Sequence, residues 1–200
     1  METKQIINPN FNYGNGDDGE TQPTVNGRTS KGDPIVRFYN QFEIWTKQLC
    51  EALDNLEPTG ERTRNAVKLL TYLRDHAYCL GAQAYTQNVG KWTWDAYVLD
   101  FMDAEIKALE PEAHNFLTPN VSHRDLLKLE ELRLQTRTLE SFATLALPTK
   151  PDGSYSTNYL ILNRLSSYIY LLENYLRVCY GEDLPTADWT MDENPEFNND

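Results

Sequence analysis

The stretch D-P-I-V-R-F-Y-N-Q-F-E-I-W-T-K-Q-L-C-E-A-L-D-N-L, from Asp33 to Leu56, sets a helical period near the start of this 200-residue chain. Asp33 and Pro34 are typical of a helix start, with Asp as the N-cap and Pro in the first turn. Apolar side chains then recur three and four residues apart, at Ile35, Phe38, Tyr39, Phe42, Trp45, Leu49, Ala52, Leu53 and Leu56. This spacing predicts one long amphipathic helix, which Pro58-Thr59-Gly60 ends.

The same spacing returns further along the chain and predicts four more helices. Their apolar runs cover Val67–Ala84, Trp94–Leu109, Leu126–Ala146 and Leu160–Cys179. Ser122, with Asp125 three residues on, resembles a capping box at the start of the fourth helix, and Gly181 is placed to close the fifth. Because no repeat or β-rich segment is present, we expect an all-α fold, a bundle of five helices.

Before the first helix, Asn15 to Pro34 reads N-G-D-D-G-E-T-Q-P-T-V-N-G-R-T-S-K-G-D-P and predicts an ordered loop. Glycines allow close backbone approach to a ligand, consecutive N–H groups can bind an anion, and Arg28 and Lys31 add charge for a phosphate chain. A solvated arm with two turns is the alternative. We therefore expect a loop over 1–33, the bundle over 34–181 and an acidic mobile tail over 182–200.

Charge and cysteine content exclude several classes of protein. Thirty acidic against eighteen basic residues argue against a nucleic-acid binder, which needs a basic face. No apolar segment has membrane length and no signal peptide is recognisable, so we expect a cytoplasmic protein without a membrane partner. Cys50, Cys79 and Cys179 are widely spaced, which predicts buried free thiols. The histidines show no metal-ligand spacing.

Several charged or polar residues lie at positions where a ligand or partner would explain them. Arg133, Arg137 and Glu140 share one face of the fourth predicted helix, where two neighbouring arginines repel unless an anion lies between them. Local pairs of Arg133 with Glu130 and of Arg137 with Glu140 are the alternative. Glu43 lies beside an apolar stripe and either has a basic partner or points outward. Asn163 and Arg164 face a ligand or solvent.

Five motifs, in order, resemble the PduO-type ATP:cob(I)alamin adenosyltransferases. Residues 15–21, N-G-D-D-G-E-T, resemble the family's T/N-G-D-x-G-x-T, and residues 27–34, G-R-T-S-K-G-D-P, resemble G-R-x-x-K-x-D-P. F-L-T-P at 116–119 lies where the family has F-I-L-P. R-L-Q-T-R-T-L-E at 133–140 resembles R-x-x-x-R-R-A-E, and L-N-R-L-S-S-Y at 162–168 resembles L-N-R-L-S-D-Y.

The resemblance implies a homotrimer of five-helix bundles with ATP and Mg²⁺ at the subunit interface and a corrinoid such as cobalamin as second substrate. The implied nucleotide-binding residues are Asn15, Gly16, Asp17, Gly19, Thr21, Arg28, Lys31, Arg137, Glu140 and Asn163. The implied catalytic residues are Arg133, Arg137, Glu140 and Phe116, with Phe116 closing the lower face of the corrinoid. Glu43 and Arg133 are implied to pair across subunits. No metal ligand set from the protein alone is implied.

The departures from the family pattern are mostly lost cations. Gly14, Thr138 and Ser141 stand where the family has basic residues. Ser167 replaces an acid, Glu43 is a lengthened Asp, and residues 119–120 lack a double glycine. Because each missing donor weakens stabilisation of a leaving triphosphate, a second hypothesis is a non-catalytic protein. It would bind or sequester a nucleotide or cyclic nucleotide signal at the subunit interface, and this hypothesis includes a viral origin. A third is a helical interaction module without a ligand.

Overall fold

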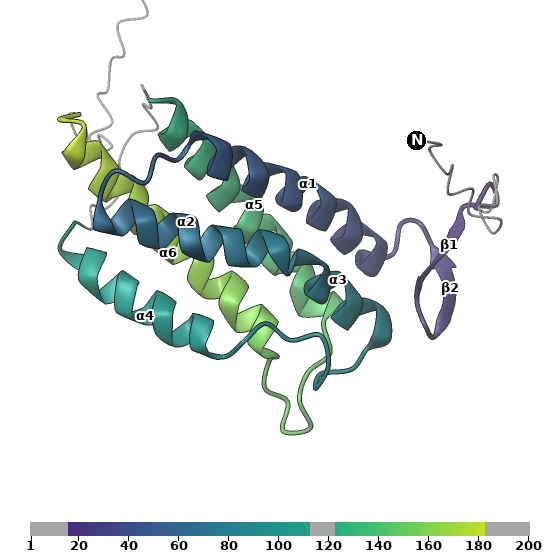
Figure 1. The fold of residues 1–200 in the computed structure, drawn as a ribbon. Helices are drawn as coiled ribbons and strands as arrows, with labels where there is room; N and C mark the ends of the chain where they lie inside the picture. Colours follow the sequence, from purple (N-terminus) through teal and green to yellow (C-terminus); the bar gives the residue numbers. More distant parts are fainter. Residues whose placement is uncertain (1–15, 113–122, 183–200) are drawn as a thin grey trace, which may run out of the picture.

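The computed structural model describes residues 16–112 and 123–182. Its elements follow the order β1 (Glu20–Thr24), β2 (Gly27–Ser30), α1 (Pro34–Asn55), α2 (Glu61–Asp75), α3 (Ala77–Thr86), α4 (Tyr97–Leu109), the 3-10 turn η1 (Glu110–Glu112), α5 (Arg124–Ala146) and α6 (Thr157–Cys179). α2 and α3 together take the place of the second predicted helix. The predicted helical bundle is therefore confirmed, and a two-stranded hairpin lies at one end of it (Figure 1).

α5 lies between α1 and α6, and α4 lies beside α6 (Figure 1). The amide of Gln135 on α5 donates to Gln41 on α1 at 2.8 Å, and Lys128 forms an ion pair with Glu51 at 2.8 Å. Because the higher number on one helix meets the lower number on the other, α1 and α5 run antiparallel. The ends of α5 and the starts of α1 and α6 consequently share the end of the bundle that carries the hairpin (Figure 1).

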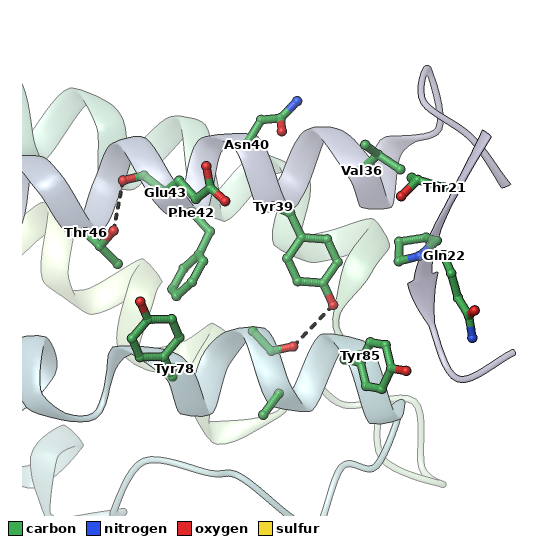
Figure 2. A pocket seen from close by; sticks show the side chains of 13 residues that line it. Thr21, Gln22, Val36, Tyr39, Asn40, Phe42, Glu43, Thr46, Tyr78 and Tyr85 are labelled. Carbon is green, nitrogen blue, oxygen red and sulfur yellow. Dashed lines mark hydrogen bonds between the residues drawn. The ribbon is translucent and has the colours of Figure 1, made fainter. Parts of the chain in front are cut away.

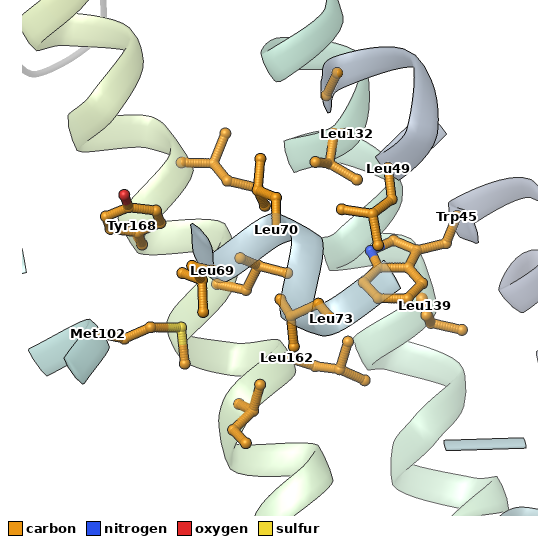
Figure 3. Packing of buried hydrophobic residues seen from close by; sticks show 14 of the residues in the cluster. Trp45, Leu49, Leu69, Leu70, Leu73, Met102, Leu132, Leu139, Leu162 and Tyr168 are labelled. Atoms are coloured by element: carbon orange, nitrogen blue, oxygen red, sulfur yellow. The ribbon is translucent and has the colours of Figure 1, made fainter. Parts of the chain in front are cut away.

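The core is a continuous set of aromatic and aliphatic side chains from all the long helices. Trp45 is fully buried between α1 and α5, and its indole Nε1 donates to Thr136 Oγ1 at 3.0 Å. Figure 3 shows Trp45 near Leu49 and Leu139, with Leu70 and Leu73 of α2 between α5 and α6. The apolar residues whose spacing predicts the helices therefore form this core. No described helix is long and apolar enough to cross a membrane.

The predicted helix ends at Asp33 and Gly181 are confirmed. Asp33 caps α1 by accepting from Ile35 N at 3.0 Å, and Gly181 follows α6 with a φ of +66°. α5 begins at Arg124, and its N-cap residue, His123, makes no side-chain capping bond. The proposed capping residue Ser122 lies outside the described residues. Its expected partner Asp125 instead accepts a hydrogen bond from the Tyr180 hydroxyl.

The second predicted helix breaks at His76, which separates α2 from α3. The indole Nε1 of Trp94 donates to the His76 carbonyl oxygen at 2.9 Å, and the imidazole Nδ1 lies 2.9 Å from Tyr72 O. These contacts give side-chain hydrogen-bond partners to backbone carbonyl oxygens at the junction between α2 and α3. The apolar spacing continues across the break, so the periodicity gives no sign of it.

Residues 20–30 of the ordered segment expected before the bundle form a two-stranded hairpin. β1 and β2 pair antiparallel, with Glu20 opposite Ser30, Thr21 opposite Thr29 and Thr24 opposite Gly27. The register shifts between Thr21 and Thr24. Asn26-Gly27 is a dipeptide typical of tight hairpin turns and is the one sequence signal for this element, from which no hairpin was predicted.

The cysteines are free, as expected, but none of them is buried. Cys50 and Cys179 are exposed, and Cys79 is half-buried. Cys50 follows the core residue Leu49 on α1, and one residue along a helix rotates a side chain by about 100°. Cys50 therefore lies outside the core, although it is next to a core residue in the sequence.

Candidate functional site

The structure brings together Glu140 on α5 and Asn163 on α6, two residues that are 23 positions apart in sequence. The Asn163 amide Nδ2 donates to Glu140 Oε1 at 2.7 Å, and the Tyr159 hydroxyl donates to the same oxygen at 3.3 Å. Burial, together with the nearby Glu140 carboxylate, raises the pKa of Tyr159. The tyrosine therefore stays a neutral donor at physiological pH, and Glu140 is fixed with one oxygen occupied.

Arg137 lies on the exposed side of α5, one turn before Glu140. Within residues 16–112 and 123–182 no hydrogen bond or ion pair to its guanidinium is formed, so the local pair with Glu140 is absent. An arginine without an internal partner keeps all five of its donors for an external anion. Arg137 and Glu140 thus offer a cation and an acceptor beside Asn163.

Arg133 is bound within its own chain. Its Nε lies 3.2 Å from Glu173 Oε2 on α6, and Nη2 lies 3.6 Å from Glu130. The guanidinium carbon is 5.6 Å from the centre of the Tyr170 ring. The local Glu130 pair is therefore observed, and Glu173 is a partner that the sequence did not reveal. Glu43 is exposed on α1, and its pairing with Arg133 of another subunit stays a prediction.

Glu173 is 6% exposed, and burial raises its pKa to about 8, against the lowering effect of Arg133. Glu130 disfavours its charged form, whereas Arg177 favours it. A carboxyl whose folded pKa is raised contributes stability that is complete below its ordinary pKa and is lost as pH rises through the folded value. The stabilising contribution of protonated Glu173 therefore declines as pH rises from its ordinary pKa toward about 8.

We expect the unfolding free energy of the wild type to fall by up to about 2 kcal/mol between pH 6 and 7.5, relative to Glu173→Gln. Glutamine keeps the shape of the side chain and does not titrate in this range. Urea unfolding of both proteins at each pH gives the difference directly. Parallel pH profiles would mean that Glu173 is already ionised at pH 6 as the partner of Arg133.

The hairpin segment holds the predicted phosphate-binding residues that the structure describes. Lys31 Nζ donates to Gly16 O at 2.7 Å, and Arg28 forms an ion pair with Asp18 at 2.8 Å. The backbone N–H of Glu20 and then Arg28 lower the pKa of Asp18. Both cations thus contact oxygens of their own loop. A phosphate that binds here would have to replace these contacts.

The glycine requirement is clearest at Gly16, whose φ is +118°. A Cβ at this position would lie 2.8 Å from Glu20 O, closer than real Cβ atoms approach a carbonyl oxygen. The other predicted loop residues follow it on the hairpin: Asp17 and Gly19 are exposed, and Thr21 is half-buried. Asn15 and Phe116 lie outside the described residues.

A groove of about 790 Å³ lies between α1 and α3 and is closed at one end by β1. Figure 2 shows Tyr39 and Phe42 of α1 reaching toward α3, where Tyr78 and Tyr85 lie. The Tyr39 hydroxyl donates to Gly81 O at 3.2 Å, and burial raises the pKa of Tyr39 to about 12. None of the described residues lining the groove is Lys, Arg or His.

Two of the predicted site residues, Thr21 and Glu43, line this groove, whereas its aromatic residues were not expected to form a site. The apolar period assigns Tyr39 and Phe42 to the core, and only the placement of α3 shows that they border a cavity. The described residues therefore form two groups, the hairpin with the groove and the Arg137, Glu140 and Asn163 group. Within the described chain no hydrogen bond or ion pair joins the two groups.

The family model described as Cobalamin adenosyltransferase matches residues 12–176. A variant of the PduO-type ATP:co(I)rrinoid adenosyltransferase from Lactobacillus reuteri, complexed with ATP, has a TM-score of 0.67 at 15% identity and covers 88% of this chain and 99% of that chain. A second variant from this organism, complexed with cobalamin and ATP, has a TM-score of 0.66 at 16% identity, covering 88% and 98%. No curated protein sequence matches.

Proposed function

Because the chain belongs to the cobalamin adenosyltransferase family, we propose that it transfers the adenosyl group of ATP to a reduced corrinoid. Co(I) of the corrinoid substrate supplies an electron pair to C5′ of the ribose, a Co–C bond forms, and the C5′–O bond to triphosphate breaks. Triphosphate leaves with the electrons of that bond. The protein supplies orientation, charge stabilisation and exclusion of water, while the corrinoid supplies the nucleophile.

The observation that carries the proposal is the hydrogen bond between Glu140 and Asn163 beside Arg137. Arg137 and Glu140 come from one family-like motif and Asn163 from another, and the hydrogen bond joins the two motifs. Arg137 is suited to the leaving triphosphate because its guanidinium has no other partner among the described residues. Asn163 and Glu140 are suited to the polar edge of the nucleoside, since an amide and a carboxylate read hydroxyl and amine groups.

The second part of the proposal is a homotrimer in which the hairpin of one subunit meets the α5–α6 surface of its neighbour. The exposed side of α5 carries Leu127, Leu134 and Leu145, and Ile44 is exposed on the adjacent α1. An apolar strip of this kind on a bundle surface marks an interaction site. A trimer would also unite Arg28 and Lys31 with Arg137, which the single chain keeps apart.

The groove between α1 and α3 suits the corrinoid better than the triphosphate. Its described lining is aromatic and polar without a cation, which is typical of sites for large and mainly apolar ligands. Among the described residues no cluster of His, Cys, Asp and Glu forms a metal site, so Mg²⁺ would enter on the phosphates of ATP. We propose the cytoplasm, which supplies ATP, as the place of action.

A second candidate function is nucleotide binding without transfer, and the hydroxyls on α5 favour it. Thr138 Oγ1 donates to Leu134 O at 3.1 Å, and Ser141 Oγ donates to Thr138 O at 2.7 Å. At the two positions where the family pattern has arginine, this chain thus has short side chains turned onto their own helix. A sequestering protein needs the nucleotide surface but not the full set of leaving-group donors.

One assay separates the two functions. The protein is mixed with Mg-ATP and chemically reduced cobalamin, and the corrinoid spectrum is followed under anaerobic conditions. Conversion to the adenosyl form establishes transfer. An unchanged spectrum at high protein concentration, together with calorimetric binding of ATP, ADP or a cyclic nucleotide, would establish the binding protein instead.

A further inference from the structure

An aromatic pair, Tyr155 and Tyr159, lies beside the Glu140–Asn163 contact. The rings of Tyr155 and Tyr159 stack with centroids 4.0 Å apart and planes 26° from parallel. Tyr159 donates its hydroxyl to Glu140 Oε1 at 3.3 Å. Tyr155 is 40% exposed. A flat and partly open aromatic ring therefore borders the proposed nucleotide surface.

The turn before α6 fixes this ring in advance. Lys150 N donates to Ser154 O at 2.8 Å, and Gly153 N donates to Lys150 O at 2.9 Å. Gly153 adopts a φ of +82°, which a glycine tolerates without strain. Ser156 then caps α6 by accepting from Tyr159 N at 3.4 Å. A side chain that is already ordered loses little entropy when a ligand binds against it.

We propose that Tyr155 is the stacking surface for the purine base of the bound nucleotide, with Tyr159 as its support. Glu140 Oε2, which accepts no hydrogen bond from the described residues, is the acceptor for an amine or hydroxyl of the nucleoside. The inference rests on the proposed function and identifies how that site recognises the base. Bases stack on aromatic side chains because every base has a π face.

A purely structural role for Tyr155 is the competing explanation. Its position before the Ser156 cap is that of a hydrophobic staple, in which an apolar side chain packs on the first turn of the helix. Leucine keeps an apolar contact at this position and removes the planar ring, whereas phenylalanine keeps both. Tyr155→Leu and Tyr155→Phe therefore separate stacking on a base from packing on α6.

The test is isothermal titration of the full chain with Mg-ATP and with Mg-tripolyphosphate, a ligand that has no base. We expect Tyr155→Leu to bind ATP about ten-fold more weakly and tripolyphosphate as the wild type does, and Tyr155→Phe to bind both normally. Tyr97→Leu is the matched control, because Tyr97 is a similarly exposed tyrosine on α4. Thermal unfolding of each variant reports any structural loss.

The outcomes separate this inference from the proposed function. Normal ATP binding by Tyr155→Leu overturns the base site and leaves the proposed function standing. Equal weakening of ATP and tripolyphosphate also overturns it, since the residue would then act through the fold. A wild type that binds neither ligand overturns the proposed function and the base site together.

Discussion

Arg137→Ala is expected to lower kcat/KM for adenosyl transfer by about 10²–10³-fold, which corresponds to roughly 3–4 kcal/mol of transition-state stabilisation. Negative charge develops on the triphosphate as the C5′–O bond breaks, and the family-like positions 138 and 141 hold no other cation. The folded protein should be unaffected, because the Arg137 side chain is exposed and makes no hydrogen bond within the described chain. Steady-state rates at saturating corrinoid measure the effect.

Two variants make this result specific. Arg137→Lys keeps the positive charge and loses the forked donor geometry, so it should recover part of the activity. Arg64→Ala removes an equally exposed arginine from α2 and should leave the rate unchanged. A wild-type rate for Arg137→Ala would show that Arg137 is an ordinary surface charge.

Trp45→Ala is expected to lower the unfolding free energy by about 3–5 kcal/mol, a large share of the total of about 5–15 kcal/mol for a typical domain. Trp45 is fully buried against Phe42 and Trp94, and its indole donates to Thr136. Alanine would leave a cavity between α1 and α5 and remove that hydrogen bond. For a chain of this size the midpoint of thermal unfolding should fall by about 6–20 °C.

Trp92→Ala is the matched control for this loss. Trp92 is 52% exposed, and its carbonyl oxygen, which accepts from Asn158, survives the substitution. Its unfolding midpoint should stay within a few degrees of the wild type. Similar midpoints for both variants would mean that the α1–α5 contact contributes little to stability.

The helices were largely predictable because their apolar spacing is a local property. Asp33 and Gly181 mark helix ends in the sequence, and both do so in the structure. The break at His76 was not predictable, since Trp94, whose indole donates to the His76 carbonyl oxygen, lies 18 residues further on. The hairpin was missed because its strands lack alternating apolar residues and because Pro23 lies within β1. Asn26-Gly27, a dipeptide typical of hairpin turns, was its one sequence signal.

The candidate site was only partly accessible from the sequence. Motif order was enough to propose Arg137, Glu140 and Asn163, and the last two are hydrogen-bonded in the structure, while their role stays a prediction. Glu130 was offered as a partner of Arg133, whereas the second partner, Glu173, could not be found because it lies 40 residues away on another helix. The aromatic groove and the Tyr155–Tyr159 stack depend on side chains that periodicity assigns to core or surface without showing their neighbours.

The arrangement of α1 against α5 also bears on how the protein is made. Trp45 meets Thr136, a residue 91 positions later, so α1 leaves the ribosome well before its main packing partner exists. At translation rates of about 5–20 residues per second, that delay is on the order of 5 to 20 s. Tyr78 and Trp94 are made earlier and can cover parts of Phe42 and Trp45, but the side of α1 that packs on α5 stays exposed until α5 is made, which gives chaperones an apolar surface to bind.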